Sequence, residues 1–244
     1  MELPIDIVLP VHNEAESIGA TLKEFHQVVT LKYGIPIRFI VCEDGSRDNT
    51  VEVLQQLQTE LPILLLTEKG RKGYSRAVID GFKASTSDLV GFIDSDGQCD
   101  PADFPAFVEQ HKSGNYDLVF GYRNPRHDHF VRIIMSNLFA LAYRSIFSIP
   151  LRDPSCPFLL VRQDSLREIL RGELGILKQG FWWEFIARCV RADLRIKEIP
   201  VKHRARSAGE TQVYLPSKVP RIAYEHLRGL LKLKRELDVL YPKE

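Results

Sequence analysis

The alternation of apolar runs with amphipathic stretches constrains the fold of this chain more than any other feature. The apolar runs of the first half are rich in β-branched residues, as buried strands are. They cover residues 5–11, 37–44, 62–68, 88–96 and 116–123. Stretches with helical spacing separate them, at residues 14–29, 48–60, 73–85 and 101–113. This order predicts an α/β fold with a mostly parallel central sheet and helices on both faces.

After Arg123 the pattern becomes rich in helices. Helices are predicted at residues 130–147, 162–171 and 179–192, then a short strand at 195–201 and a long basic amphipathic helix at 216–240. No repeat or low-complexity tract interrupts the chain, and its 244 residues can bury a full core as one large domain.

Composition narrows the class of protein. A formal net charge of +1 argues against a nucleic-acid partner held by bulk electrostatics. The four cysteines lie far apart without a CxxC pair, so we expect reduced thiols and neither structural zinc nor a disulfide framework. The first apolar run is too short for a signal peptide, and no segment approaches the ~20 apolar residues of a membrane span. A cytoplasmic location is therefore expected.

Polar residues follow the predicted strands at their carboxyl ends, where ligands bind in open parallel sheets. They are His12, Asn13 and Glu14 after the first strand, Glu43 and Asp44 after the second, Glu68 after the third, and Asp94, Asp96 and Gln98 after the fourth. Asn13, Asp48 and Asp100 are expected to cap helices or turns. Asp44, Asp94 and Asp96 are not needed as caps, so we expect them to form a site.

The stretch "DSDGQCD" from Asp94 to Asp100 admits three interpretations. An EF-hand calcium loop is excluded, because the positions that require Gly and Glu are Cys99 and Pro105. An acidic turn and a metal site remain. Two carboxylates on one face of an extended chain repel each other unless a cation lies between them, which favours a divalent ion bound by oxygen ligands.

Two glycine-rich motifs that commonly bind nucleotides are absent from the sequence. The chain contains neither GxGxxG nor GxxxxGK[ST], which disfavours dinucleotide redox and P-loop chemistry. The sequence "GRKG" at residues 70–73 precedes a predicted helix, and its backbone could bind an anion. A solvated cationic turn is the alternative interpretation of that segment.

Seven segments together resemble the inverting family-2 glycosyltransferases, and within them the dolichol-phosphate mannosyltransferase and polyprenyl-phosphate glycosyltransferase branch. In order they are "VLPVHNEAESI", "CEDGSRDNT", "KGYSRAVIDGF", "VGFIDSDGQCDP", "VFGYR", "LRDPSCPF" and "EIPVKHRARSAGETQ". The resemblance implies the nucleotide-diphospho-sugar glycosyltransferase fold of the GT-A type. It divides residues 1–212 into a nucleotide-sugar-binding half, 1–123, and an acceptor-side half, 124–212, followed by the terminal helix within 213–244.

The resemblance also assigns roles to residues. Asp94, Asp96 and Gln98 would hold Mg²⁺ or Mn²⁺ against the diphosphate of a nucleotide-sugar donor, with Asp96 also counted as catalytic. Donor-binding positions are Pro10, His12, Glu14, Asp44, Lys72, Gly73 and Asp94. Arg123, Arg132 and Arg206 match basic positions that meet phosphates and are expected to be catalytic, whereas surface charge or ion pairing is expected for Arg126, Arg152 and Arg204.

Three functions remain open on this sequence. The first is metal-dependent transfer of a hexose, of mannose or glucose type, to a polyprenyl or dolichyl phosphate, whose anionic phosphate needs cations rather than a base. The second has a hydroxyl acceptor, for which Glu184 is the candidate base, although Glu184 also suits a helix surface beside packed aromatic residues. The third is an inactive partner subunit.

The basic terminal helix has two expected outcomes. Its apolar stripe can pack against the domain, or the helix can lie on an anionic membrane and bring a lipid acceptor to the site. The second outcome would make the protein a peripheral one on the cytoplasmic face of a membrane.

Overall fold

The computed structural model describes residues 4–124, 139, 141, 143–147, 149, 151–172, 174–177, 180–204 and 219–242, with the side chains of 219–224 and 226 excepted. Its seven strands are β1 (Ile5–Val11), β2 (Ile37–Glu43), β3 (Ile63–Leu66), β4 (Leu89–Phe92), β5 (Leu118–Arg123), β6 (Leu159–Arg162) and β7 (Ile196–Val201). The α-helices are α1 (Ile18–His26), α2 (Thr50–Leu57), α3 (Tyr74–Ala84), α4 (Phe104–Gly114), α6 (Gln163–Ile169), α7 (Phe181–Arg191) and α8 (Val219–Leu240). A π-helical segment, Gln27–Lys32, extends α1, and a 3₁₀ turn, Pro101–Asp103, precedes α4.

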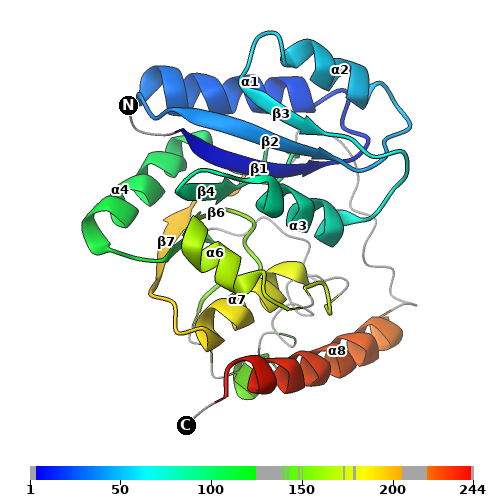
Figure 1. Ribbon diagram of the computed structural model, residues 1–244, viewed down its shortest axis with the longest axis vertical. Coiled ribbons are helices and arrows are strands. Elements are labelled where there is room, and N and C mark those ends of the chain that lie inside the picture. The colour runs from blue at the N-terminus through cyan, green and yellow to red at the C-terminus, as the bar shows by residue number, and fades with distance from the viewer. Residues whose placement is uncertain are drawn as a thin grey trace.

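The strands form one sheet in the order β3-β2-β1-β4-β6-β5-β7 (Figure 1). Strands β1 to β4 are parallel neighbours, β5 is parallel to β7, and β6 runs antiparallel between β4 and β5. The expected mostly parallel α/β sheet is therefore confirmed. The sequence-based prediction did not include β6, because an apolar run of four residues does not distinguish strand from helix.

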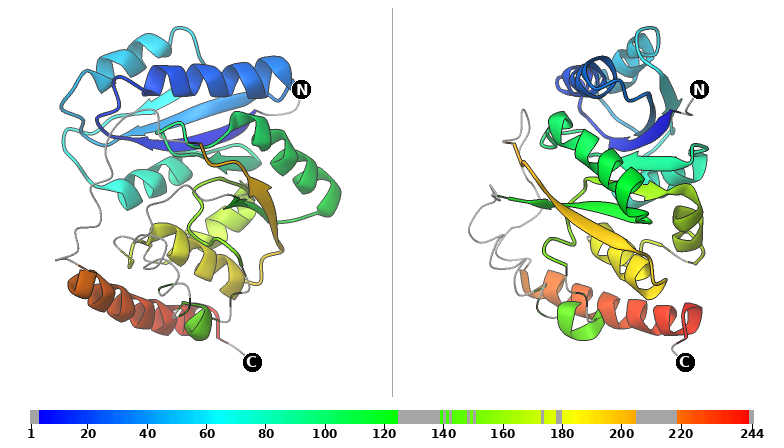
Figure 2. Two further views of the ribbon diagram at one scale, coloured as in Figure 1. Left: turned by 180° about the vertical axis from the view of Figure 1, so that it is seen from behind. Right: turned by 90° about the vertical axis from the view of Figure 1, so that its left-hand side faces the viewer.

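Helices cover both faces of the sheet (Figure 2). On one face Phe25 of α1 packs edge-on against Phe39 of β2 and against Phe104 of α4, with ring centroids 6.1 and 5.4 Å apart. On the other face Phe82 of α3 contacts Phe92 of β4 and Phe185 of α7. These aromatic residues are fully buried, and they fix the helices that carry residues of the candidate site.

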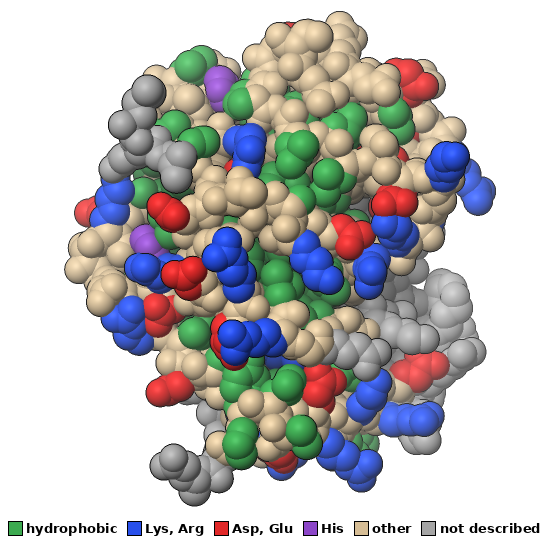
Figure 3. Space-filling view, in the orientation of Figure 1, with side chains coloured by type: hydrophobic (Ala, Val, Ile, Leu, Met, Phe, Trp, Pro, Cys, Tyr) green, Lys and Arg blue, Asp and Glu red, His purple; other side chains and the backbone are tan. Residues whose placement is uncertain are grey.

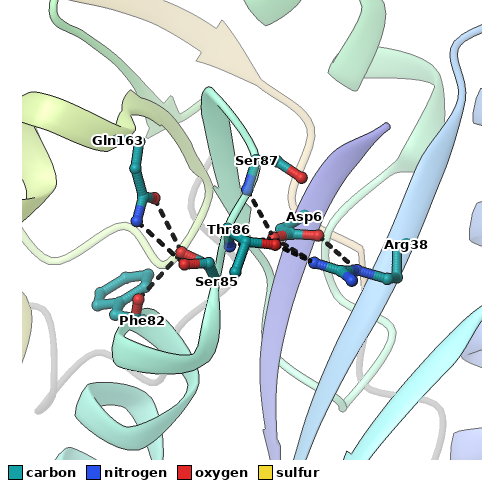
Figure 4. Close-up of polar contacts among 7 residues, drawn as sticks. All are labelled: Asp6, Arg38, Phe82, Ser85, Thr86, Ser87 and Gln163. Carbon is teal, nitrogen blue, oxygen red and sulfur yellow. Dashed lines mark hydrogen bonds and ion pairs between the residues drawn. The ribbon is translucent and has the colours of Figure 1, made fainter. Parts of the chain in front are cut away.

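A buried polar network joins the strands at the amino edge of the sheet, where the parallel strands begin (Figure 4). The carboxylate of Asp6 in β1 is fully buried and accepts two hydrogen bonds from Arg38 of β2, at 2.8 and 2.9 Å. The backbone amides of Thr86 and Ser87, just before β4, donate to the same carboxylate. The hydrogen bond to Asp6 raises the pKa of Arg38. Such saturation with donors is what a buried carboxylate requires.

The terminal helix α8 packs on the domain. Its residues Leu230, Leu233 and Leu237 are fully buried, and Glu236 pairs with the buried Arg188 of α7 at 2.7 Å. Of the two expected outcomes for the apolar stripe, packing against the domain is therefore the one observed for these leucines. None of the helices in the described part of the chain is long and apolar enough to cross a membrane.

Candidate functional site

The carboxyl ends of β1, β2 and β4 lie side by side, and hydrogen bonds join the loops that follow β1 and β2. The amide of Asp44, just after β2, donates to the carbonyl of Val11 at 2.9 Å. Asn13, in the left-handed region with φ 54°, donates its amide to the hydroxyl of Ser46 and accepts from the amide of Arg47. Asn13 thus connects two loops rather than capping α1, which begins after Ser17.

Asp44 occupies the backbone site predicted to bind an external anion. Its buried carboxylate accepts from the amides of Lys72 and Gly73, at 2.6 and 2.9 Å, and Arg71 lies 3.8 Å away. The close approach requires Gly45, whose φ is +66° and where a Cβ atom would lie 2.7 Å from the backbone nitrogen of Arg71. In this structure the anion at the start of α3 is therefore the protein's own carboxylate.

Lys72, predicted to bind the nucleotide-sugar donor, contacts two carboxylates through its side chain, in addition to the bond from its backbone amide to Asp44. Its ammonium group pairs with Glu68, four residues earlier, and with Asp80 at 3.2 Å. The hydrogen bond to Glu68 raises the pKa of Lys72. Partial desolvation opposes this shift, and the hydrogen bond to Asp80 adds to it. Because the side chain is 36% exposed, it stays accessible to a ligand.

Asp94 lies two residues beyond β4. Its carboxylate accepts a hydrogen bond from Tyr74, which in turn accepts one from Trp182. The hydroxyl of Tyr74, the first residue of α3, donates to Oδ1 of Asp94 at 2.8 Å. The indole Nε1 of Trp182, in α7, donates to the oxygen of Tyr74 at 2.9 Å. Although 39% of Tyr74 is exposed, its hydroxyl lies between these groups, and its desolvation together with the charge of Asp94 raises the pKa well above the usual value. The hydroxyl of Tyr74 therefore stays protonated and donates a hydrogen bond to Asp94.

Asp96 and Gln98 lie in the turn after Asp94 rather than in extended chain. Asp96 accepts from the amide of Gln98 at 3.1 Å, and Gly97 has φ +71°. The side-chain nitrogen of Gln98 donates to the carbonyl of Arg204, so its amide oxygen remains to act as a ligand. The expected sharing of one strand face by Asp94 and Asp96 is thus wrong, because β4 ends at Phe92.

The donor set of this turn fits a hard divalent cation. Asp94 and Asp96 are half-buried carboxylates, and Gln98 adds a neutral oxygen. Oxygen ligands of this kind suit Mg²⁺ and Mn²⁺, which bind through one or two carboxylates and complete their shells with water or phosphate. Among the described residues no cluster of three or more His, Cys, Asp and Glu side chains could hold a metal, so a site here would rely on further ligands from substrate or water.

The three donor-binding candidates of the first strand and its loop line the same edge. Pro10 is buried in β1 opposite Cys42 of β2. His12 is half-buried, and within the described residues its Nδ1 has no hydrogen-bond partner. Glu14 accepts from the hydroxyl of Ser17 at 2.6 Å, and its amide donates to Thr50. The structure therefore brings these residues together with Asp44, as the sequence predicted.

Arg123, expected to meet phosphate, instead forms a buried ion pair. Its Nε and one terminal nitrogen bond both oxygens of Asp153, at 2.7 and 2.9 Å, and the same terminal nitrogen donates to Ser155. The two side chains are only 7% and 6% exposed. This geometry suits an arginine that fastens the 153–155 loop to β5 better than one that meets a ligand. Arg126, Arg132 and Arg206 lie outside the described residues.

Glu184 is neither an accessible base nor a residue of a helix surface. Its side chain is fully buried in α7, where its oxygens accept from the amides of Gly175 and Leu177 and from Arg188. Burial raises the pKa of Glu184, and these donors oppose that shift. Because it binds the amides of Gly175 and Leu177, the buried Glu184 holds the 175–177 loop against α7.

The remaining predicted roles are structural. Asp100 caps the turn before α4 by accepting from Ala102, as expected. Asp48 accepts from the amide of Thr50, the first residue of α2. Desolvation would raise the pKa of Asp48, but the hydrogen bonds from Thr50 and Ala15 together outweigh it and lower the pKa. Arg204 pairs with Glu24 and Asp100, and Arg152 lies over the ring of Tyr122, which fits the roles expected for these two arginines.

Sequence reasoning missed three residues near the site, namely Tyr74, Asp153 and Trp182. Tyr74 follows Gly73 within a segment that was singled out, but the only signal there was glycine and positive charge. Trp182 was noted only as part of an aromatic cluster. Its hydrogen bond spans 108 positions of the chain, and no local pattern predicts a contact of that kind.

Comparisons with known proteins show which families and folds this chain is similar to. The family model described as Glycosyl transferase family 2 matches residues 6–170. The undecaprenyl-phosphate 4-deoxy-4-formamido-L-arabinose transferase of Pseudomonas aeruginosa PAO1 is 29% identical over 86% of this chain and 61% of its own length. The dolichol-phosphate mannosyltransferase of Pyrococcus furiosus is 25% identical over 97% of this chain and 66% of its own length. The chain thus spans about three fifths of the length of the Pseudomonas relatives it matches.

Solved structures share the fold. Glucosyl-3-phosphoglycerate synthase from Mycobacterium tuberculosis, solved with Mn²⁺, uridine diphosphate and glucosyl-3-phosphoglycerate, superposes with a TM-score of 0.66 at 18% identity. The match covers 95% of this chain and 80% of that one. The same synthase has also been solved with Mg²⁺ and uridine diphosphate. The likeness confirms the expected GT-A type fold.

Proposed function

Since the chain belongs to glycosyl transferase family 2, we propose that it transfers a hexose, of mannose or glucose type, from a nucleotide-diphosphate sugar to a polyprenyl or dolichyl phosphate with inversion. One observation carries the proposal. The half-buried carboxylates of Asp94 and Asp96 lie at the carboxyl edge of the sheet beside the loops of Asp44 and Glu14, where a nucleotide and its diphosphate can be bound together.

In this proposal Asp94, Asp96 and Gln98 hold Mg²⁺ or Mn²⁺. When bound, such an ion neutralises the charge that develops on the departing nucleoside diphosphate. Pro10, His12 and Asp44 line the nucleoside side of the site, and Lys72 lies at its rim. The oxygen donor set of the turn and the likeness to synthases solved with Mn²⁺ or Mg²⁺ support the metal.

A lipid phosphate as acceptor is supported by the two relatives described above, an undecaprenyl-phosphate 4-deoxy-4-formamido-L-arabinose transferase and a dolichol-phosphate mannosyltransferase. A phosphate monoester is anionic at neutral pH and needs no base. The burial of Glu184 removes the candidate base that a hydroxyl acceptor would use. Arg132 and Arg206 are the proposed phosphate contacts, since Arg123 is engaged by Asp153.

Peripheral membrane contact is proposed for the outer face of α8. This face, opposite the buried leucines, carries Arg228, Lys232 and Arg235, and beside them Leu227 and Leu231 are about half exposed. Figure 3 shows Lys and Arg side chains spread over the visible face, several of them at the lower right. Cations beside exposed leucines favour an anionic lipid surface, which would bring the site to its lipid acceptor.

Transfer of radiolabelled sugar into an organic-extractable product tests the main proposal. The assay combines labelled GDP- and UDP-hexoses with undecaprenyl or dolichyl phosphate and Mn²⁺ or Mg²⁺, and Asp96→Ala or EDTA should abolish transfer. Asp164→Asn, at an exposed site on α6, is the matched control and should retain it. Label found only in water-soluble product would refute the lipid acceptor, and transfer that survives EDTA would refute the metal.

Vesicle sedimentation tests the role of α8. The paired substitution Arg228→Glu and Arg235→Glu should reduce binding to vesicles that contain anionic lipid, with little change for neutral vesicles. Equal binding of the wild type to both kinds of vesicle would count against the proposed surface.

A further inference from the structure

The carboxylate of Asp94 is oriented by residues from two distant segments. Tyr74 begins α3, Trp182 lies in the first turn of α7, and Asp94 follows β4. The two hydrogen bonds that connect them, of 2.9 and 2.8 Å, run from Trp182 through Tyr74 to Asp94. None of the sequence motifs had assigned a role to Tyr74 or Trp182.

The direction of these hydrogen bonds follows from the chemistry of the groups. An indole nitrogen can only donate, so the oxygen of Tyr74 must accept from Trp182. The hydroxyl proton of Tyr74 then points to Asp94, which as a carboxylate can only accept. Trp182 therefore sets the rotation of the Tyr74 hydroxyl, and that hydroxyl holds one oxygen of Asp94.

Packing fixes both donors in place. The ring of Trp182 lies edge-on against the ring of Phe92 in β4, with the ring centroids 4.4 Å apart, and it also contacts Phe82 of α3. Tyr74 directly follows Gly73, whose amide is bound by the carboxylate of Asp44 at the end of β2. The start of α3 is thus tied to the ends of β2 and β4, and the hydroxyl has little freedom to leave Asp94.

We propose that Tyr74 and Trp182 are positioning residues, which hold the carboxylate of Asp94 in the orientation needed to bind the divalent cation and the donor diphosphate. This inference rests on the proposed function, because it requires that Asp94 contribute to a metal–nucleotide site. Outer groups that orient metal-binding carboxylates typically change metal affinity by about 10–100-fold when they are removed.

Nucleotide binding measured by calorimetry tests the inference without turnover. UDP and GDP are titrated in MnCl₂ and, separately, in EDTA, and the ratio of the two affinities reports the manganese-dependent gain. Tyr74→Phe should lower this gain about tenfold and leave the affinity in EDTA unchanged. Tyr33→Phe, which alters an exposed tyrosine remote from the carboxyl edge, should leave both affinities unchanged.

The two tryptophans of α7 offer a second matched pair. Trp182→Phe should lower the manganese-dependent gain in the same direction as Tyr74→Phe and by a smaller factor. Trp183→Phe removes a neighbouring, equally buried indole that packs on Tyr143, and it should leave the gain unchanged. Equal losses from both substitutions would identify a general packing effect and overturn the role of Trp182.

A double-mutant cycle isolates the connection to Asp94. In an Asp94→Ala background Tyr74→Phe should cause no further loss of the manganese-dependent gain. A full additional loss in that background, or an unchanged gain in Tyr74→Phe alone, would overturn the inference and leave the proposed function standing. A wild-type protein that shows no manganese-dependent gain with either nucleotide would instead overturn the proposed metal–nucleotide site, and the positioning role with it.

Discussion

Asp6, at the amino ends of the parallel strands, differs from Asp94 and Asp96, beyond the carboxyl end of β4, in burial and in the groups that contact it. At the amino edge Asp6 is fully buried, pairs with Arg38 and accepts two backbone amides. At the carboxyl edge Asp94 and Asp96 are half-buried; Asp94 accepts from the hydroxyl of Tyr74, and Asp96 accepts from the backbone amide of Gln98. Arginine pairing recurs at the amino edge, where Asp117 before β5 binds Arg195 before β7.

This difference separates carboxylates that hold the fold from carboxylates suited to a ligand. A buried acid that is bonded on both oxygens by arginine and amides has a saturated shell and stabilises the pairing of strands. A partly buried acid that follows a strand end and is oriented by a neutral hydroxyl lies where a cation and a diphosphate can be bound. Substitutions of Asp6 and of Asp96 should therefore change different measurements.

The largest expected effect is on activity at the carboxyl edge. Asp96→Asn should lower kcat/KM for sugar transfer by about 10³-fold, because it removes a negative charge from the proposed metal ligands. The melting temperature should change little, since the side chain is partly exposed. Kinetics and thermal unfolding on the same preparation check both statements, and a large loss of stability would erase the contrast between the two edges.

At the amino edge the expected effect is on stability. Asp6→Asn should lower the free energy of unfolding by about 3 kcal/mol, because Arg38 and two backbone amides lose a buried anionic partner. Urea unfolding measures this loss, with exposed Asp164→Asn as control. The kcat/KM of the folded fraction should stay within a few-fold of wild type. A 10²-fold fall in that value would show that Asp6 also serves the reaction.

Arg123 tests whether a buried pair at the carboxyl edge behaves like one at the amino edge. Arg123→Lys keeps the charge but loses the two-pronged contact with Asp153, so unfolding should require about 2 kcal/mol less free energy. We expect KM for the acceptor to change less than tenfold. A large rise in that KM at unchanged stability would restore the phosphate-binding role that the sequence predicted.

The smallest effect is a dependence of stability on pH at the amino edge. The hydrogen bond from Arg195 lowers the pKa of Asp117 below its usual value of 3.8. The stabilisation is therefore present above that value and is lost as the pH falls through the lowered pKa in the folded protein. Melting temperatures at pH 7 and pH 3 should differ slightly less in Asp117→Asn than in wild type, because Arg195 is half exposed and such pairs contribute under about 1 kcal/mol.

Much of the fold could be predicted because its signals are local. The run at 5–11 coincides with β1, and the other predicted strands contain β2, β3, β4, β5 and β7. The segment of β6 is too short to carry a periodic pattern, and its antiparallel position depends on β4 and β5. Strand-end carboxylates were likewise predictable, because the carboxyl ends of parallel strands meet at one edge.

Roles that depend on partners could not be predicted from the sequence. Nothing local distinguishes Arg123, which pairs with Asp153, from an arginine that meets a phosphate. The sequence made Glu184 a candidate base, but in the structure its side chain is fully buried beside Arg188. In both cases the function of a charged group follows from the donors, acceptors and water around it, which come from distant parts of the chain.

The sequence by itself determined the α/β architecture and the position of Asp44, Asp94 and Asp96 at the ends of strands, because hydrophobic periodicity is a local property of the chain. Only the tertiary structure decided that Asp44 binds the backbone before α3, that Asp6 is saturated with donors, and that Tyr74 and Trp182 orient Asp94. The reason is physical: hydrogen bonds and desolvation depend on which groups meet in three dimensions, and those groups lie up to 108 positions apart here.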